Sequence, residues 1–336
     1  MPVWLSRWVM FRSRSAVFAI VLLLLAAAPA AARSPDARTE HQRIVNYWTA
    51  ERLRTAIPRE RVVAPARQAP AARPDGKGPG GGGNGNVTGA SWTKGGLILK
   101  ASGKVFFTLG GSNWTCSGSV AQDSRTSYSL VMSAAHCAVD ETTGEFATNW
   151  IFIPEYDSAP SRTCANTTHG CWTARALVVH QGYATAGSFN TQATVHDYAF
   201  AVVAEGGKTG TAQLDATAGS FPIQFGGVSA GDRLYAFGYP AAGKYKGNDL
   251  TYCAGPIFTD SWNDDLTWGM ACTMTGGSSG GPWLASFDEA TGTGVLSSLN
   301  SYGYSGVKNM YGPKFDHRTA AVYSSADAAT ANTVVP

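Results

Sequence analysis

Gly276-Gly277-Ser278-Ser279-Gly280-Gly281-Pro282 is a pair of serines enclosed by glycines near the end of a 336-residue chain. A serine hydroxyl becomes a useful nucleophile when a base activates it and backbone N–H groups stabilise the oxyanion that its attack creates. Glycine allows the sharp turn that such a loop needs, because it has no Cβ to clash. A flexible loop explains the same composition equally well. The stretch therefore predicts a catalytic serine only if a matching base and acid occur elsewhere.

Two other segments offer the base and the acid. Ser133-Ala134-Ala135-His136-Cys137 follows an apolar run, and Asp197 begins the apolar run 198–203. We predict that His136 is the general base and that Asp197 fixes the orientation of its imidazole. The alternatives for the acid are Asp140 and Asp215, and the histidines that we interpret as surface or packing residues are His41, His169, His180, His196 and His317.

The three segments, in the order His136, Asp197 and Ser279, resemble the trypsin/chymotrypsin-like serine endopeptidases over roughly residues 90 to 325. The serine loop is closer to bacterial secreted members, including the glutamyl-endopeptidase-like group. Ser279, rather than Ser278, matches the nucleophile of that family. The resemblance implies an oxyanion hole formed by the backbone N–H groups of Gly277 and Ser279. It also implies that a protein or peptide substrate is hydrolysed through an acyl-enzyme, and no cofactor is expected.

Short apolar or alternating runs, separated by Gly, Asn, Asp and Ser, fill the chain after residue 89. This texture is typical of an all-β protein, and by itself it fits a sandwich as well as a barrel. The resemblance implies two six-stranded β-barrels of chymotrypsin type with the active site between them. The first barrel is expected at about 90–210 and the second at about 220–325, within a protease domain of residues 90–336.

Six cysteines occur in the chain, and an even number in an exported protein favours disulfides. Spacing alone leaves their pairing open. The family resemblance implies a bridge beside the catalytic histidine, and it leaves two short pairs as the simplest remainder. No Cys-x-x-Cys pair is present and the histidines are scattered, so we expect no structural zinc site and assign no metal-binding residues. The predicted pairs are Cys116–Cys137, Cys164–Cys171 and Cys253–Cys272.

Residues 1–32 have the pattern of a secretory signal peptide. Three arginines precede the apolar run 16–28, and small residues follow it. A membrane anchor is the alternative, but the run is shorter than the ~18 residues of a spanning helix. We therefore predict a secreted, extracellular protein that has no membrane association after cleavage.

Residues 33–89 are predicted to be a pro-segment and a glycine-rich linker. His41 to Ile57 could form an amphipathic helix that ends at Pro58. Residues 59–74 are rich in Pro, Ala and Arg, and residues 76–89 are almost all glycine and asparagine, which is linker composition. A plain disordered tail is the alternative. The pro-segment interpretation predicts that the enzyme is made as a zymogen.

The basic residues gather in this leader. Residues 1–89 carry 13 Lys and Arg against 5 Asp and Glu, a net charge of +8, whereas residues 90–336 carry 13 against 18, a net charge of −5. The remaining domain lacks the positive charge that nucleic-acid binding requires. We expect a monomer that binds protein or peptide rather than nucleic acid.

The substrate pocket is predicted from positions that match the family. Ser301-Tyr302-Gly303 follows Ser279 by 22 residues, where relatives pair with the substrate backbone, although a simple hairpin explains it equally well. Thr273 replaces the aspartate of trypsin-like members, and Asn300 replaces the histidine of glutamate-specific ones. Together with Met274, these residues predict a mixed pocket of undefined preference.

Ser278 occupies the place where many animal members carry an aspartate that pairs with a new N-terminus. An uncharged hydroxyl cannot form that ion pair, so any activation must work differently. A catalytically weak or inactive binding protein on the same scaffold, or an esterase that uses the same triad, are the alternative functions.

Overall fold

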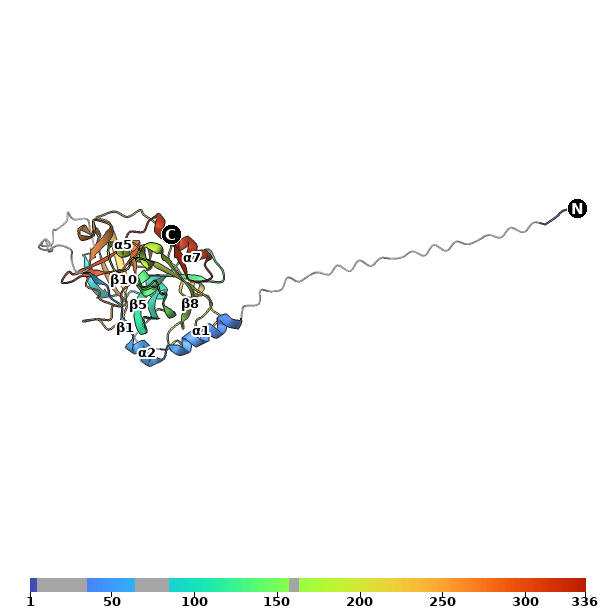
Figure 1. The fold of residues 1–336 in the computed structure, drawn as a ribbon, viewed down its shortest axis with the longest axis horizontal. Coiled ribbons are helices and arrows are strands. Elements are labelled where there is room, and N and C mark those ends of the chain that lie inside the picture. The colour runs from blue at the N-terminus through green and yellow to red at the C-terminus, as the bar shows by residue number, and fades with distance from the viewer. Residues whose placement is uncertain (5–34, 64–84, 157–162) are drawn as a thin grey trace. The chain divides into compact units, whose positions relative to one another are not determined.

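Six antiparallel strands within residues 102–203 close into a barrel, which is the first half of the fold (Figure 1). Their order is β5-β4-β7-β8-β9-β6, and pairing of β5 with β6 completes the circle. Gly110 and Gly111 form the two-residue β4–β5 turn, where φ values of 57° and 76° favour glycine. The strands are β4 (Ser102–Leu109), β5 (Ser112–Ala121), β6 (Ser129–Ser133), β7 (Thr148–Pro154), β8 (Trp172–His180) and β9 (Ala199–Val203).

Eight strands, arranged in two sheets, form the second half of the fold. One sheet runs β15-β14-β10-β11-β3, and the other runs β12-β13-β17. Their edges meet where β11 packs on β13 and β15 packs on β17, so the strands surround a second core that includes Leu234, Met270 and Trp283. The strands are β3 (Val87–Ser91), β10 (Arg233–Gly238), β11 (Thr251–Pro256), β12 (Phe258–Thr259), β13 (Thr267–Ala271), β14 (Pro282–Asp288), β15 (Thr293–Leu299) and β17 (Asn309–Pro313). The predicted all-β class is confirmed.

This computed structural model describes residues 1–4, 35–63, 85–156 and 163–336. Most of the predicted signal peptide and of the glycine-rich linker lies outside the described residues. Residues 35–336 form one compact unit, and residues 1–34 are assigned to another, of which 1–4 are exposed. Among the described residues, no helix is long and apolar enough to cross a membrane.

The two ends of residues 85–336 cross between the two halves. The first strand of the domain, β3, pairs with β11 in the second half. The last helix, α7 (His317–Ala328), packs on β8 and β9, and β18 (Thr333–Val335) lies parallel to β8. Asp316 begins α7 with a capping box in which its side chain accepts backbone N–H groups and Thr319 reaches back.

Residues 35–63 bind along the domain. The single helix expected over 41–57 is two helices, because Thr49 caps a new one by accepting the N–H of Arg52. Ile44, Trp48 and Leu53 are buried in the main core cluster. The elements are α1 (Pro35–Tyr47), α2 (Ala50–Thr55), β1 (Ile57–Pro58), which pairs with β5, and β2 (Val62–Val63), which pairs with β16 (Gly303–Tyr304).

Short helical turns connect the strands. They are α3 (Gly96–Ala101), η1 (Ala135–Cys137), α4 (Gln181–Ala184), α5 (Thr191–Val195), α6 (Leu214–Ala218) and η2 (Ser261–Asn263). The three predicted disulfides are all present: Cys116–Cys137, Cys164–Cys171 and Cys253–Cys272. Each bridge joins residues of the same half.

Candidate active site

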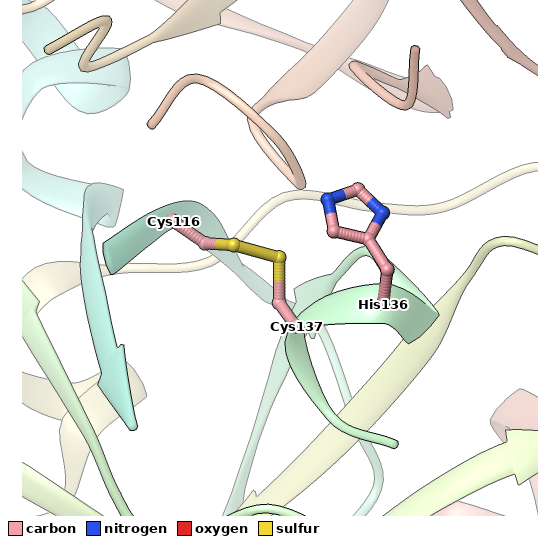
Figure 2. Close-up of side chains that lie close together, drawn as sticks. All are labelled: Cys116, His136 and Cys137. Atoms are coloured by element: carbon pink, nitrogen blue, oxygen red, sulfur yellow. A yellow bond between two sulfur atoms is a disulfide. The ribbon is translucent and has the colours of Figure 1, made fainter. Parts of the chain in front are cut away.

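His136 lies in the short helix η1, directly after β6, and is fully buried. The neighbouring Cys137 is bonded to Cys116 on β5, which ties this turn to the barrel wall. Figure 2 shows the imidazole and the disulfide on the same turn. Within the described part of the chain, these three residues are the one group close enough to hold a metal ion. Both sulfurs are consumed in the disulfide, however, so no thiolate ligand is available.

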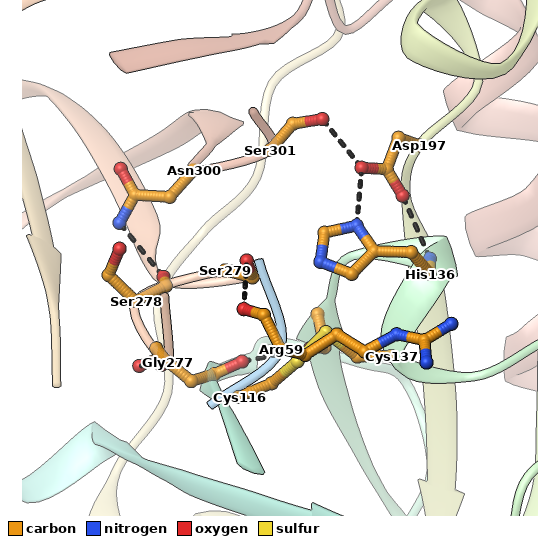
Figure 3. The surroundings of a disulfide bond; sticks show 12 residues. Arg59, Cys116, His136, Cys137, Asp197, Gly277, Ser278, Ser279, Asn300 and Ser301 are labelled. Carbon is orange, nitrogen blue, oxygen red and sulfur yellow. Dashed lines mark hydrogen bonds and ion pairs between the residues drawn. A yellow bond between two sulfur atoms is a disulfide. The ribbon is translucent and has the colours of Figure 1, made fainter. Parts of the chain in front are cut away.

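Asp197 precedes β9 and contacts His136 twice (Figure 3). Its Oδ2 lies 2.7 Å from His136 Nδ1, and its Oδ1 accepts the backbone N–H of His136 at 2.9 Å. The Ser301 hydroxyl donates a third hydrogen bond to Oδ2 at 2.5 Å. This arrangement places a proton on Nδ1 and leaves Nε2 as the basic atom.

Burial acts on both titratable groups of this pair. Burial raises the pKa of Asp197, but the electrostatic interaction with His136 and the hydrogen bonds from His136 and Ser301 outweigh it, so the net pKa is lowered. Burial lowers the pKa of His136, and the attraction of Asp197 opposes it only in part. The pair therefore holds an ionised carboxylate beside a neutral imidazole.

The alternative acids have other partners. Asp140 accepts the backbone N–H groups of Thr142 and Thr143 in a turn. Asp215 bonds to the hydroxyl of Ser129 at the start of α6. Asp197 is thus the aspartate that the fold brings to His136.

The serine loop comes from the second half and meets His136 from the other side. Gly277 and Gly280 have φ values of 95° and 82°, which favour glycine. At Gly280 an added Cβ would lie 2.2 Å from the Ser133 hydroxyl oxygen, so only glycine fits against the first barrel. The loop glycines therefore serve both the turn and its close packing.

Asn300 and Ser278 hold this loop from within. Ser278 Oγ donates to the carbonyl of Thr275 at 2.8 Å, so this hydroxyl is held by a neutral hydrogen bond within the loop. The Asn300 amide donates to the carbonyls of Ser278 and Phe237 at 3.0 and 2.7 Å, and it accepts the indole N–H of Trp283 at 2.7 Å. Asn300 is fully buried and does not line the pocket for which it was predicted.

One carbonyl oxygen occupies the centre of the site. The Arg59 carbonyl accepts the Ser279 hydroxyl at 3.2 Å and the Gly277 N–H at 3.1 Å (Figure 3). His136 Nε2 is buried without a hydrogen-bond partner among the described residues. In this state the serine and the histidine therefore do not bond to one another.

Residues 57–63 continue through the site on both sides of this carbonyl. The Arg59 N–H donates to the Thr115 carbonyl at 2.9 Å, and the Gly303 N–H donates to the Arg61 carbonyl at 3.0 Å. Both flanking pairings, of β1 with β5 and of β2 with β16, are parallel. The segment thus fills a groove between the two halves.

A cavity of about 230 Å³ opens beside Ser279. It is lined by Glu60 of the N-terminal segment and by Met310, which sequence reasoning missed because β17 carries no recognisable motif. Tyr302 lines the cavity, but its hydroxyl points to Asp260 at 2.6 Å. A larger cavity, of about 710 Å³, is lined by none of the predicted site residues. The predicted residues that line the smaller cavity are Thr273, Met274, Ser301, Tyr302 and Gly303.

Comparison with known proteins finds similar chains among the solved structures. No protein-family model and no curated protein matches the chain. Among solved structures it is similar to the protease Anisep from Arthrobacter nicotinovorans, with 37% identity over 72% of this chain and 100% of that one, at a TM-score of 0.60. It is also similar to a thermostable serine protease, AL20, from an extremophilic microorganism, with 34% identity over 69% and 99% of the two chains and a TM-score of 0.59.

Proposed function

The chain belongs to the bacterial serine proteases of chymotrypsin fold, and on this premise we propose that it is a secreted serine endopeptidase made as a zymogen. The observation that supports this most is that two groups of the serine loop donate hydrogen bonds to the same carbonyl oxygen. The hydroxyl of Ser279 and the N–H of Gly277 both donate to the Arg59 carbonyl. The buried His136–Asp197 pair belongs to the same site.

In the proposed reaction, Ser279 Oγ attacks the scissile carbonyl while His136 Nε2 accepts its proton. The carboxylate of Asp197 stabilises the imidazolium that results. The N–H groups of Gly277 and Ser279 stabilise the oxyanion, a contribution of about 3–4 kcal/mol per donor. The imidazolium then protonates the leaving amine, and water releases the acyl group by the same steps.

The proposed zymogen rests on the direction of the segment in the groove. A substrate side chain that enters the cavity beside Ser279 takes the place of Glu60, and its scissile carbonyl takes the place of the Arg59 carbonyl. Such a substrate runs from the position of Arg61 to that of Arg59, opposite to the segment itself. The reversed segment would therefore place its leaving nitrogen on the wrong side of the serine, so it blocks the site without being hydrolysed.

We further propose the domain order signal peptide 1–32, pro-segment and linker 33–89, and protease domain 90–336. Three disulfides support an extracellular location, because such bonds persist in oxidising compartments. Cleavage in the linker after residue 63 would free the segment from the domain and allow it to leave the groove.

A fluorophosphonate probe tests this function. The secreted precursor should react slowly, and the same protein should react rapidly after limited proteolysis of the linker. A peptide-library digest with the activated protein should then give peptide products. Absence of probe reaction after segment removal would favour the inactive binding protein, and turnover of esters alone would favour the esterase.

A further inference from the structure

A buried carboxylate contacts the segment that fills the groove. Glu141 is 5% exposed, and its Oε2 accepts the hydroxyl of Tyr183 at 3.1 Å. The same oxygen forms an ion pair with Nη2 of Arg61 at 2.5 Å. In the part of the chain that the structure describes, Arg61 is the one cation at ion-pair distance from Glu141. Removal of the segment would take away the counter-charge of this carboxylate, so the site it leaves favours a new positive charge.

An aromatic wall completes this site. The guanidinium of Arg61 lies 5.3 Å from the ring centroid of Phe189. The Phe189 ring packs edge-on against His136, with centroids 6.2 Å apart, and against Tyr183 at 6.4 Å. A planar cation can contact such a ring while it bonds to a carboxylate, which suits arginine better than lysine.

The position of this site relative to the scissile bond follows from counting along the segment. The peptide bond between Arg59 and Glu60 lies at Ser279, and Glu60 lines the cavity. Arg61 is the next residue on that side, and its carbonyl bonds to the Gly303 N–H. A substrate with its P1 side chain in the cavity therefore presents its P2 side chain where that of Arg61 lies.

We propose that Glu141, together with Phe189 and Tyr183, forms an S2 subsite that selects a basic P2 residue, arginine above all. The inference rests on the proposed protease function and adds a substrate class to it. Arg61 occupies the subsite in the precursor, and a substrate arginine takes its place after activation. The net charge of −5 on residues 90–336 agrees with a basic substrate.

Matched fluorogenic peptides test the proposal. Four peptides share one P1 residue and carry arginine, lysine, citrulline or leucine at P2, and the enzyme is the full chain activated by proteolysis in its linker. Citrulline keeps the shape of arginine without its charge. For the wild type, kcat/KM should be at least about tenfold higher for arginine than for citrulline, the lower end for a hydrogen bond to a charged group. In Glu141→Gln this ratio should fall to near one.

Two further variants make the result specific. Glu145→Gln removes an exposed acid from the same loop and should keep the arginine-to-citrulline ratio. Phe189→Leu should lower the ratio in part, because the ring contact is lost. Melting temperatures show whether each variant is folded.

Equal kcat/KM for arginine and citrulline in the wild type would overturn the subsite. A ratio that Glu141→Gln leaves unchanged would do the same, even if that variant binds a synthetic 35–63 peptide less tightly, because Glu141 would then serve only to dock the segment. In either case, rapid reaction of the activated protein with a fluorophosphonate would leave the protease function standing. No reaction with the probe would instead remove the protease function itself.

Discussion

Ser278 and Ser279 are neighbours with the same hydroxyl group, but the loop directs them to different partners. Ser278 Oγ bonds to Thr275 within the loop, whereas Ser279 Oγ points into the groove and meets the Arg59 carbonyl. The neutral bond of Ser278 needs no new N-terminus to form. The loop therefore has its shape while residues 57–63 are bound, and in the proposed zymogen we expect activation to require only that the groove be emptied.

This difference predicts opposite results for two single substitutions. Ser279→Ala should abolish peptide hydrolysis and probe labelling by the activated protein, because the nucleophile is lost. Ser278→Ala should keep measurable turnover, because it removes only one internal hydrogen bond of about 1 kcal/mol. Hydrolysis by each activated variant, measured on one peptide, checks the assignment. Activity in the Ser279 variant and none in the Ser278 variant would reverse it.

Asp197 offers a second test at this scale. Asp197→Asn keeps the shape of the side chain but presents an amide to His136 Nδ1, which favours the wrong tautomer. We expect kcat to fall by about 10⁴ with little change in the melting temperature. Near-normal turnover would mean that the buried pair is structural only.

At the scale of elements, the helices of the N-terminal segment help to hold residues 57–63 in the groove. Strand β1 and strand β2 each pair over only two residues, so they cannot hold the groove alone. Trp48, which lies between helices α1 and α2, anchors these strands: its side chain is 1% exposed, and its indole N–H donates to the Asn149 carbonyl at 2.6 Å. Inhibition is therefore expected to depend on residues far from the serine.

Trp48→Ala in the intact precursor should release activity without any cleavage. Loss of a buried tryptophan ring costs about 3–5 kcal/mol, which is enough to raise the fraction of molecules with an open groove many-fold. The rate of fluorophosphonate labelling measures this fraction. Arg54→Ala changes an exposed residue of the same segment and serves as the control. Equal labelling of both variants and wild type would show that the helices do not anchor the segment.

The stability of the fold around helix α4 is expected to depend on pH, because a histidine caps this helix. His180 Nδ1 accepts the N–H of Gly182 at 2.8 Å, and the ring stacks on His196 with centroids 4.1 Å apart. Burial, with the nearby charges of His196 and Arg318, lowers the pKa of His180 from 6.5 to about 4, while Asp316 opposes this weakly. Between these two pH values the unfolded chain binds a proton that the folded protein refuses, so stability falls as the pH drops from 6.5 towards 4.

The melting temperature should accordingly be lower at pH 5 than at pH 7. His180→Asn should show a smaller difference, since asparagine can cap the helix without titrating. Gln213→Asn, a change at the uncharged N-cap residue of another short helix, α6, should keep the wild-type difference. The same pH dependence in all three proteins would exclude His180 as its source.

At the scale of the whole molecule, the sequence indicated the candidate catalytic residues but not the N-terminal segment that occupies the site. The three candidate triad residues lie in short local motifs, and the family resemblance implied the three disulfide pairs that the structure contains. The docking of Arg59 on Gly277 and Ser279 joins residues more than 200 positions apart, and the local composition of 59–63 carries no signal for it. Asn300 is predicted in the pocket from its position in the family motif. That position does not show that its amide turns inwards and bonds within the serine loop.

The two halves of the protease domain each include a strand from the far end of the chain. Strand β3 completes the sheet of the second half, β18 lies beside β8 of the first, and no disulfide joins the halves. A chain cut at the exposed pair Gly226–Gly227 would give two fragments, each holding a strand that the other needs. Such fragments should reassemble by complementation when they are mixed. Loss of either β3 or β18 should prevent that reassembly, which makes the domain a natural candidate for a split enzyme.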